Sequence, residues 1–325
     1  MIFHRPRAAA VECHDLTACR DFTEAATWID LLEPTSEEET ALEQALGIDV
    51  PTRDEIQDIA TSSRLYRRDD ALFMTATILT KSDTSRPEAS AILFILTPSR
   101  LITVRYATPS AFDTFRARRD GSPDEFSSPG QVFGGLTDTI VERVADILEA
   151  VGKSLDELSP DVFRRDKRKT NDFREMLERL GRFSDLTSKT RESLLSLSRF
   201  FSFFLDQDKQ RLVPESERAA LDGHAKTVMH DLAALSDHSA FLSSKIAFLL
   251  DATLGLINVE QNAIIKIFSV AAVVFLPPTL VASIYGMNFQ HMPELAWRGG
   301  YPFAILLMIG SAILPFYFFK RKGWL

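Results

Sequence analysis

Two long uncharged runs near the C-terminal end of the chain constrain its fold more than any other feature. The first run, residues 267–285, has 19 residues, and the second, residues 299–319, has 21. A helix of the first length spans roughly 28 Å, close to the thickness of the hydrocarbon core of a bilayer. We therefore expect both runs to cross a membrane as helices.

The segment between the two runs is short. Its 13 residues, 286–298, are too few for a folded domain and enough for a tight hairpin loop. The loop begins with Gly286-Met287-Asn288, which places a glycine, a thioether and a carboxamide at the mouth of the membrane. We expect the function of the chain to concentrate in this loop.

Charge is divided unequally along the chain. Residues 267–325 have a net charge of +3, so the overall charge of -8 leaves -11 for residues 1–266. An acidic domain is a poor partner for nucleic acid and attracts cations. The start of the chain lacks the apolar core of a signal peptide, so we expect residues 1–266 in the cytosol. Lys320, Arg321 and Lys322 then hold the C-terminus on the cytoplasmic side, so both termini share one compartment.

Two cysteines, Cys13 and Cys19, lie close to His14 in the expected cytosolic part. Zinc binding is one interpretation, but two thiols and one histidine do not supply four ligands at a familiar spacing. We interpret both cysteines as free thiols in a reducing compartment.

Residues 1–130 have the alternating patterns of an α+β domain. Hairpin spacing around Asp69-Asp70 and around Pro98-Ser99-Arg100 predicts four strands of a largely antiparallel sheet. The predicted elements are a strand at 27–31, helices at 37–46 and near Pro51, and paired strands within 64–79 and 91–106.

The next segments are helical. Apolar residues at three and four spacing predict a helical hairpin from residues 131–151 and 170–205. The basic stretch 164–169 between them is either a site for anionic lipid or nucleic acid, or a solvated turn.

A single helix of 71 residues, on the order of 100 Å long, is predicted from residue 215 to residue 285. Its seam must be covered by the preceding hairpin or by other copies of the chain, and oligomerisation is the natural inference. The seam repeats every seven residues at Leu221, Val228, Leu235, Leu242, Leu249 and Leu256, with Ala225, Leu232, Ser239, Ile246 and Thr253 four residues further on.

Two helices per chain cannot enclose a polar path through lipid, so transport would require several subunits around an axis. One broad face of the first membrane helix carries polar or small residues, and it either lines a pore or packs against a partner helix. Pro277 and Pro278 leave carbonyls unbonded there, which either pore water or a kink accommodates. The pore-lining candidates are Asn262, Ile265, Phe268, Ala272, Leu276, Thr279 and Ser283.

The chemistry of the loop favours a hard, hydrated cation. Mg2+ holds its waters tightly, so a ring of carboxamides from Asn288 could accept hydrogen bonds from those waters without stripping them. Gly286 would permit the backbone turn, and Met287 would pack. Glu294 would raise the local cation concentration if it were repeated around an axis.

The stretch 260–289, which ends in LPPTLVASIYGMNF, closely resembles the CorA family of magnesium transporters. The similarity extends through Met292-Pro293-Glu294-Leu295 to the terminal residues 320–325, and more loosely to Trp28-Ile29-Asp30-Leu31 with Pro34. The related ZntB branch, which handles zinc, has isoleucine in the place of Met287, so Met287 favours the magnesium branch.

The resemblance implies a homopentamer in which an α+β cytosolic domain, a long stalk helix and a two-helix transmembrane hairpin build a funnel-shaped oligomer. It implies passage of Mg2+, often also Co2+ or Ni2+, through a selectivity filter of Gly286, Met287 and Asn288, with a hydrophobic constriction around Phe268 and Leu276. It also implies closure by intracellular Mg2+. The basic collar would be Lys266, Lys320, Arg321 and Lys322, and the acidic candidates for an entrance ring or for sensing are Asp251, Asp222, Asp231 and Asp237.

We therefore expect a multi-pass inner (plasma) membrane transporter without a catalytic cofactor. An enzymatic function would be supported only by the scattered His224, His230 and His238. A sensor anchored by a membrane hairpin is the better alternative to a transporter. The expected segments are 1–130 (cytosolic domain), 131–214 (helical hairpin), 215–266 (stalk), 267–285 (first membrane helix), 286–298 (outer loop), 299–319 (second membrane helix) and 320–325 (basic tail).

Overall fold

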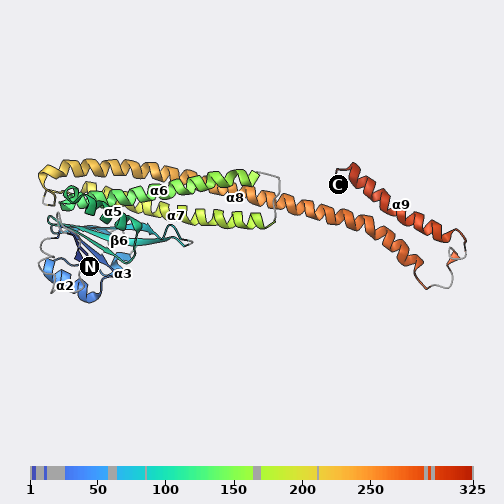
Figure 1. Cartoon of the computed structure of the whole chain (residues 1–325), viewed down its shortest axis with the longest axis horizontal. Coiled ribbons are helices and arrows are strands. Elements are labelled where there is room, and N and C mark those ends of the chain that lie inside the picture. The colour runs from blue at the N-terminus through green and yellow to red at the C-terminus, as the bar shows by residue number, and fades with distance from the viewer. Residues whose placement is uncertain are drawn as a thin grey trace. The chain divides into compact units, whose positions relative to one another are not determined.

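The computed structural model describes residues 2–4, 11–12, 26–57, 64–84, 86–163, 170–210, 212–288, 292–293 and 297–323. The chain divides into two compact units, Met1–Leu250 and Asp251–Leu325 (Figure 1). Cys13, Cys19, Glu294 and the basic stretch 164–169 lie outside the described residues.

One sheet forms the base of the first unit. In its described part, seven strands lie in the order β2-β1-β3-β7-β6-β5-β4, and only β3 and β7 pair in parallel. The predicted hairpins β4–β5 and β6–β7 are confirmed, whereas β1, β2 and the parallel pair were not predicted. The strands are β1 (Ile2–His4), β2 (Val11–Glu12), β3 (Trp28–Leu32), β4 (Leu65–Arg68), β5 (Ala71–Thr80), β6 (Glu88–Leu96) and β7 (Leu101–Arg105).

Helices cover both faces of this sheet. They are α2 (Ser36–Leu46), α3 (Arg53–Gln57), α5 (Ser110–Gly121), α6 (Pro129–Phe163) and α7 (Thr170–Asp206). The short 3-10 helix η1 (Pro123–Phe126) and the first part of α8 (Glu215–Tyr285) pack against α6. Figure 1 shows α2 and α3 on one side of the sheet and the long helices on the other. The strand alternation explains both layers: Leu93 and Ile95 belong to the core shared with α2 and α3, whereas the Phe94 ring lies 5.2 Å from the Phe200 ring of α7.

Local sequence sets the limits of α2. The Thr35 hydroxyl accepts a hydrogen bond from the Glu38 amide at 3.3 Å, and the Glu38 carboxylate accepts one from the Thr35 amide at 3.0 Å. This reciprocal capping satisfies two amides that have no partner within the helix. Gly47 ends the helix in the left-handed conformation, with φ of 64°, which glycine adopts at little cost.

The long helices of the first unit pack through aromatic rings and through close backbone approach. Phe133 of α6 lies 4.9 Å from Phe204 and 5.7 Å from Phe200, ring centre to ring centre. Gly134 and Gly152 of α6 would bring an added Cβ within 3.6 Å of side chains of α8. The helix α6 therefore packs against both α7 and α8.

The predicted heptad seam of α8 is buried. Between Leu221 and Leu249 its buried members are Leu221, Ala225, Val228, Leu232, Ser239, Leu242, Ile246 and Leu249. Leu221 and Leu242 lie beside Gly134 and Gly152 of α6, so the preceding hairpin covers the seam over this stretch. This part of the seam needs no second copy of the chain, so it does not by itself indicate self-association.

Two helical features differ from the expectations. The helix α5, whose buried residues Phe112, Phe115 and Arg119 pack within the domain, was not predicted from the sequence. The first helix of the hairpin was predicted to end near residue 151, whereas α6 continues through Pro160 to Phe163. Tertiary packing stabilises both segments, and local periodicity does not reveal it.

The second unit contains the end of α8 and the helix α9 (Gly300–Arg321). Among the described residues, these two helices contain stretches long and apolar enough to cross a membrane, and little of the apolar stretch of either is buried within the chain. The helix α8 ends at Tyr285 and α9 begins at Gly300, within one residue of the ends of the uncharged runs that face the loop. Figure 1 shows the chain turning back between α8 and α9.

Candidate functional site

The motif Gly286-Met287-Asn288 directly follows the last residue of α8. The Gly286 amide donates a hydrogen bond to the Ala282 carbonyl at 2.9 Å, and the Met287 amide donates one to the Ile284 carbonyl at 3.2 Å. These bonds satisfy carbonyls that the end of a helix would leave without partners. The first two residues of the motif thus cap the helix, and the exposed Asn288 is the first residue beyond the cap.

The absence of a side chain is the property of Gly286 that matters at this position. It is not among the described glycines with positive φ, so the backbone conformation by itself does not require glycine. An added Cβ would lie 3.1 Å from the Ala282 carbonyl oxygen, which is a tight contact with backbone. A larger residue would therefore disturb the cap that fixes the position of Asn288.

The predicted pore face of α8 is uncovered in the single chain. Its members Asn262, Ile265, Phe268, Ala272, Leu276, Thr279 and Ser283 are all exposed. Val270, which lies on the other side of the helix at 100° per residue, is buried. The chain itself therefore does not cover this face, and lipid, water or other copies of the chain must do so.

The helix α8 continues through Pro277 and Pro278. Because both residues lack an amide hydrogen, the carbonyls of Val273 and Val274 lose their partners within the helix. At 100° per residue, both prolines lie off the exposed face that contains Leu276.

The basic residues lie at the ends of the membrane segments. Lys266 is exposed on α8. Lys320 and Arg321 form the last turn of α9, and the Lys322 Nζ lies 5.8 Å from the centre of the Phe318 ring. The contact lets a charged group remain near the end of an apolar helix.

The acidic candidates for sensing are dispersed. Asp222 has a partner, since its Oδ1 lies 2.9 Å from the Nζ of the buried Lys209. Asp231, Asp237 and Asp251 are exposed on α8. No group of three or more histidine, cysteine, aspartate or glutamate residues that could hold a metal ion occurs in the part of the chain that the structure describes.

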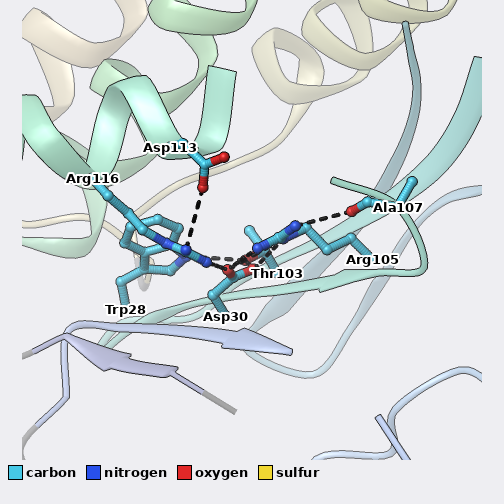
Figure 2. A network of polar contacts seen from close by, with 7 residues as sticks. All are labelled: Trp28, Asp30, Thr103, Arg105, Ala107, Asp113 and Arg116. Carbon is cyan, nitrogen blue, oxygen red and sulfur yellow. Dashed lines mark hydrogen bonds and ion pairs between the residues drawn. The ribbon is translucent and has the colours of Figure 1, made fainter. Parts of the chain in front are cut away.

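One buried polar network was not identified from the sequence (Figure 2). The Asp30 carboxylate on β3 accepts hydrogen bonds from Thr103 at 2.8 Å and from Arg105 at 2.8 and 3.0 Å, both on β7. Arg116 of α5 donates a further bond at 2.5 Å, and the Trp28 indole donates to Thr103 at 3.0 Å. The network ties α5 to the parallel strand pair. Strand alternation, which places Trp28 and Asp30 on one face of β3, was the signal that could have found it.

Electrostatics stabilises the charged form of Asp30. Burial by itself raises the pKa of this carboxyl, but the hydrogen bonds and positive charges of Arg105 and Arg116, with the hydroxyl of Thr103, outweigh burial and hold the pKa below its ordinary value. In contrast, burial raises the pKa of Asp138 on α6, although His224 lies 3.3 Å away and opposes that effect.

The fold and the uncovered apolar helices define a membrane protein in which, over the described residues, two candidate spans follow a large α+β domain. Over residues 23–321 the sequence matches the family model of the CorA-like Mg2+ transporter protein. The chain belongs to this family.

Individual relatives agree with that assignment. The chain is 36% identical to the magnesium transport protein CorA of Pasteurella multocida over 301 residues, which are 93% of this chain and 92% of that protein. It is also 36% identical to the protein of the same name from Escherichia coli K12 over 304 residues, 92% of each. The complete structure of the CorA magnesium transporter from Methanocaldococcus jannaschii has the same fold, with a TM-score of 0.71, 18% identity and coverage of 100% of this chain and 98% of that one.

Proposed function

We propose that this chain transports Mg2+ across a membrane as a channel, and that the ion passes with its hydration shell at Gly286-Met287-Asn288. Family membership supports the transport of magnesium, and it argues against an enzymatic role. The observation that carries the site is that Asn288 follows a capped helix end, directly beyond a helix whose predicted pore face is uncovered.

Hydration explains the choice of a neutral side chain. Mg2+ loses its waters reluctantly, so a selective site gains most by recognising the hydrated ion. The Asn288 carbonyl oxygen accepts hydrogen bonds from such waters, whereas a carboxylate would bind the cation itself more strongly and slow its release. Co2+ and Ni2+ are expected to compete for the same site, and uptake measured with each ion on one preparation would rank them.

The path requires several copies of the chain. Two spans cannot enclose water, and polar members of the exposed face, such as Asn262 and Thr279, are costly in contact with lipid. We infer a homopentamer with the exposed face of α8 toward its axis, in the inner membrane and with both termini in the cytoplasm. A membrane potential of 100 mV would then supply roughly 4.6 kcal/mol per divalent ion entering a negative interior.

Regulation by cytosolic Mg2+ is proposed at acids that are not already paired. Asp222 is the weakest candidate, because Lys209 already neutralises its carboxylate. Asp251 is the candidate for an acidic entrance ring, with Asp231 and Asp237 as further sensor residues. If protection of the stalk from protease by Mg2+ persists after these acids are neutralised together, they are not the sensor.

Uptake into proteoliposomes tests the filter. With a Mg2+-sensitive dye inside and a negative interior potential, wild-type protein is expected to take up Mg2+, and the Asn288→Ala variant to lose about tenfold or more of the rate. Each copy loses hydrogen bonds to ion-bound water worth about 0.5–1.5 kcal/mol each. Wild-type protein without uptake would favour the alternative of a membrane-anchored sensor.

The control is Ser311→Ala on α9. The Ser311 hydroxyl donates to the Met308 carbonyl of its own helix at 2.8 Å, so its loss should leave the rate unchanged. An Asn288→Ala variant that assembles normally and transports at the wild-type rate would remove Asn288 from the filter.

A further inference from the structure

A compact corner forms where the outer loop, residues 286–298, enters α9; because this loop carries the proposed filter, we call it the filter loop. The Gly300 amide donates to the Trp297 carbonyl at 3.0 Å, and the Phe303 amide donates to the Gly299 carbonyl at 3.0 Å. The Trp297 ring lies 5.9 Å from the Phe303 ring, centre to centre, at 56°. The indole therefore folds back over the first turn of α9 instead of extending away from it.

The absence of a side chain at Gly299 leaves room for this orientation of the Trp297 indole. Its φ of -90° is accessible to any residue, so backbone strain does not explain the glycine. An added Cβ would lie 2.8 Å from Cζ2 and 2.9 Å from Cε2 of Trp297. The position of the Trp297 ring thus explains why residue 299 is a glycine. Because that ring is exposed, a side chain at residue 299 would displace the ring and would not prevent the chain from folding.

The corner exposes large aromatic surface at the end of an apolar helix. Trp297 is 58% exposed, Tyr301 is 79% exposed and Phe303 is 45% exposed. Tyr285 ends α8 at the other end of the same loop. Aromatic rings with one apolar and one polar edge gather at the boundary between lipid and water, so Trp297, Tyr301 and Tyr285 are of the residue types expected at that boundary beside the loop.

We propose that Trp297 is an interfacial anchor, which binds the lipid headgroup boundary and positions the C-terminal end of the filter loop. The proposal rests on the proposed function, because it assumes that the loop carries the ion filter. The helix cap formed by Gly286 and Met287 holds one end of the loop, and the Trp297 corner holds the other. With both ends held, the depth of Asn288 relative to the membrane surface is set.

Fluorescence quenching tests the location of Trp297. The chain has three tryptophans, so the emission of Trp297 is the difference between the Trp324→Phe protein and the Trp324→Phe, Trp297→Phe double variant in vesicles. We expect lipids brominated near the headgroup to quench this emission more than lipids brominated near the bilayer centre. The buried Trp28 is the internal reference. Quenching of Trp297 by aqueous iodide with no effect of either brominated lipid would overturn the proposal.

Uptake kinetics test the positioning of the loop. Trp297→Ala and Gly299→Ala are each expected to raise the Mg2+ concentration for half-maximal uptake about three- to tenfold, with a change in maximal rate of less than about twofold. The double variant should be no worse than Trp297→Ala alone, because the added Cβ then has no ring to displace. Trp297→Phe should restore much of the affinity.

The matched control is Phe316→Ala, also on α9 and also 45% exposed, as Phe303 is. Phe316→Ala should leave the Mg2+ concentration for half-maximal uptake unchanged, whereas Phe303→Ala should raise that concentration. The positioning role would be overturned if the Trp297 and Gly299 changes raised the Mg2+ concentration for half-maximal uptake additively. It would also be overturned if neither change altered that concentration. Wild-type protein without Mg2+ uptake would instead refute the proposed function and leave the quenching result standing.

Discussion

At the scale of single residues, a buried network of charged and polar groups surrounds Asp30. This buried carboxylate joins two strands that are 73 residues apart in the chain, through Thr103, and it joins both to α5 through Arg116. Because Arg105 is also buried, removal of the negative charge leaves a buried guanidinium without its counterion. The energetic cost of a broken buried pair exceeds that of most surface changes.

We predict that Asp30→Asn lowers the free energy of unfolding of the first unit by about 3–5 kcal/mol. Hydrogen exchange of the β3 and β7 amides in the full-length protein would measure the loss. The control is Asp113→Asn, because Asp113 contacts the same Arg116 but has a side chain that is 72% exposed. That change should stay within about 0.5 kcal/mol, and equal effects of the two changes would contradict the assignment.

The same carboxylate predicts a dependence on acid. The pKa of Asp30 is lower in the folded protein than in the unfolded chain, where it is about 3.9. Its stabilisation is therefore fully present above about pH 4 and is lost as the pH falls through the lower folded value. The Asp30→Asn variant should lack this part of the acid dependence in the same exchange experiment.

At the scale of elements, α6 uses glycine where aromatic rings crowd it. A Cβ on Gly135 would lie 2.4 Å from the Phe126 ring and 2.7 Å from the Phe115 ring. Those two rings meet edge to face at 5.1 Å and join α5 and η1 to α6. The packing of the three elements therefore depends on the absence of a side chain at one position.

We predict that Gly135→Ala destabilises the first unit by about 1–3 kcal/mol through overpacking. Gly181→Ala on α7 is the matched control, because a Cβ there has no atom within 4 Å. In a helix interior the control should stabilise by about 0.5–1 kcal/mol. Thermal unfolding followed by Trp28 fluorescence, in proteins that also carry Trp297→Phe and Trp324→Phe, would compare them, and a Gly135→Ala protein as stable as its parent would contradict the packing argument.

Elements were predictable where local pattern and tertiary environment agree. The heptad seam and the absence of an early stop predicted α8 with its observed ends, Glu215–Tyr285. The helix α5 was not predictable in the same way, because its burial depends on Trp28, whose ring lies 5.4 Å from that of Phe115. The parallel pairing of β3 with β7 joins strands that are distant in sequence, and hairpin spacing carries no information about such pairs.

At the scale of the whole molecule, the sequence predicts the membrane spans and the loop motif, and the family follows from both. The structure adds what separate residues could not reveal: Asp222 is paired with Lys209, and Gly299 accommodates the Trp297 ring. Both relations depend on where side chains lie in the folded chain, which sequence patterns do not specify. The roles of Asn288 and of the exposed face of α8 stay predictions.

We predict that the purified chain assembles as five copies. Its mass in mild detergent, after subtraction of bound detergent, should be about five times 36.5 kDa. The physical reason is the exposed face of α8, which α9 does not bury and whose polar members are unfavourable in lipid. A mass equal to one chain at every concentration would contradict both the assembly and the pore.

The internally covered seam of α8 also bears on the order of events during synthesis. Residues 1–250 leave the ribosome before either span, and over 221–249 their apolar seam is buried by α6 of the same chain. Domains that bury their own core fold as they emerge. We therefore expect the first unit to be folded when α9 reaches the insertion machinery, so that assembly joins protomers whose seam over 221–249 is already covered.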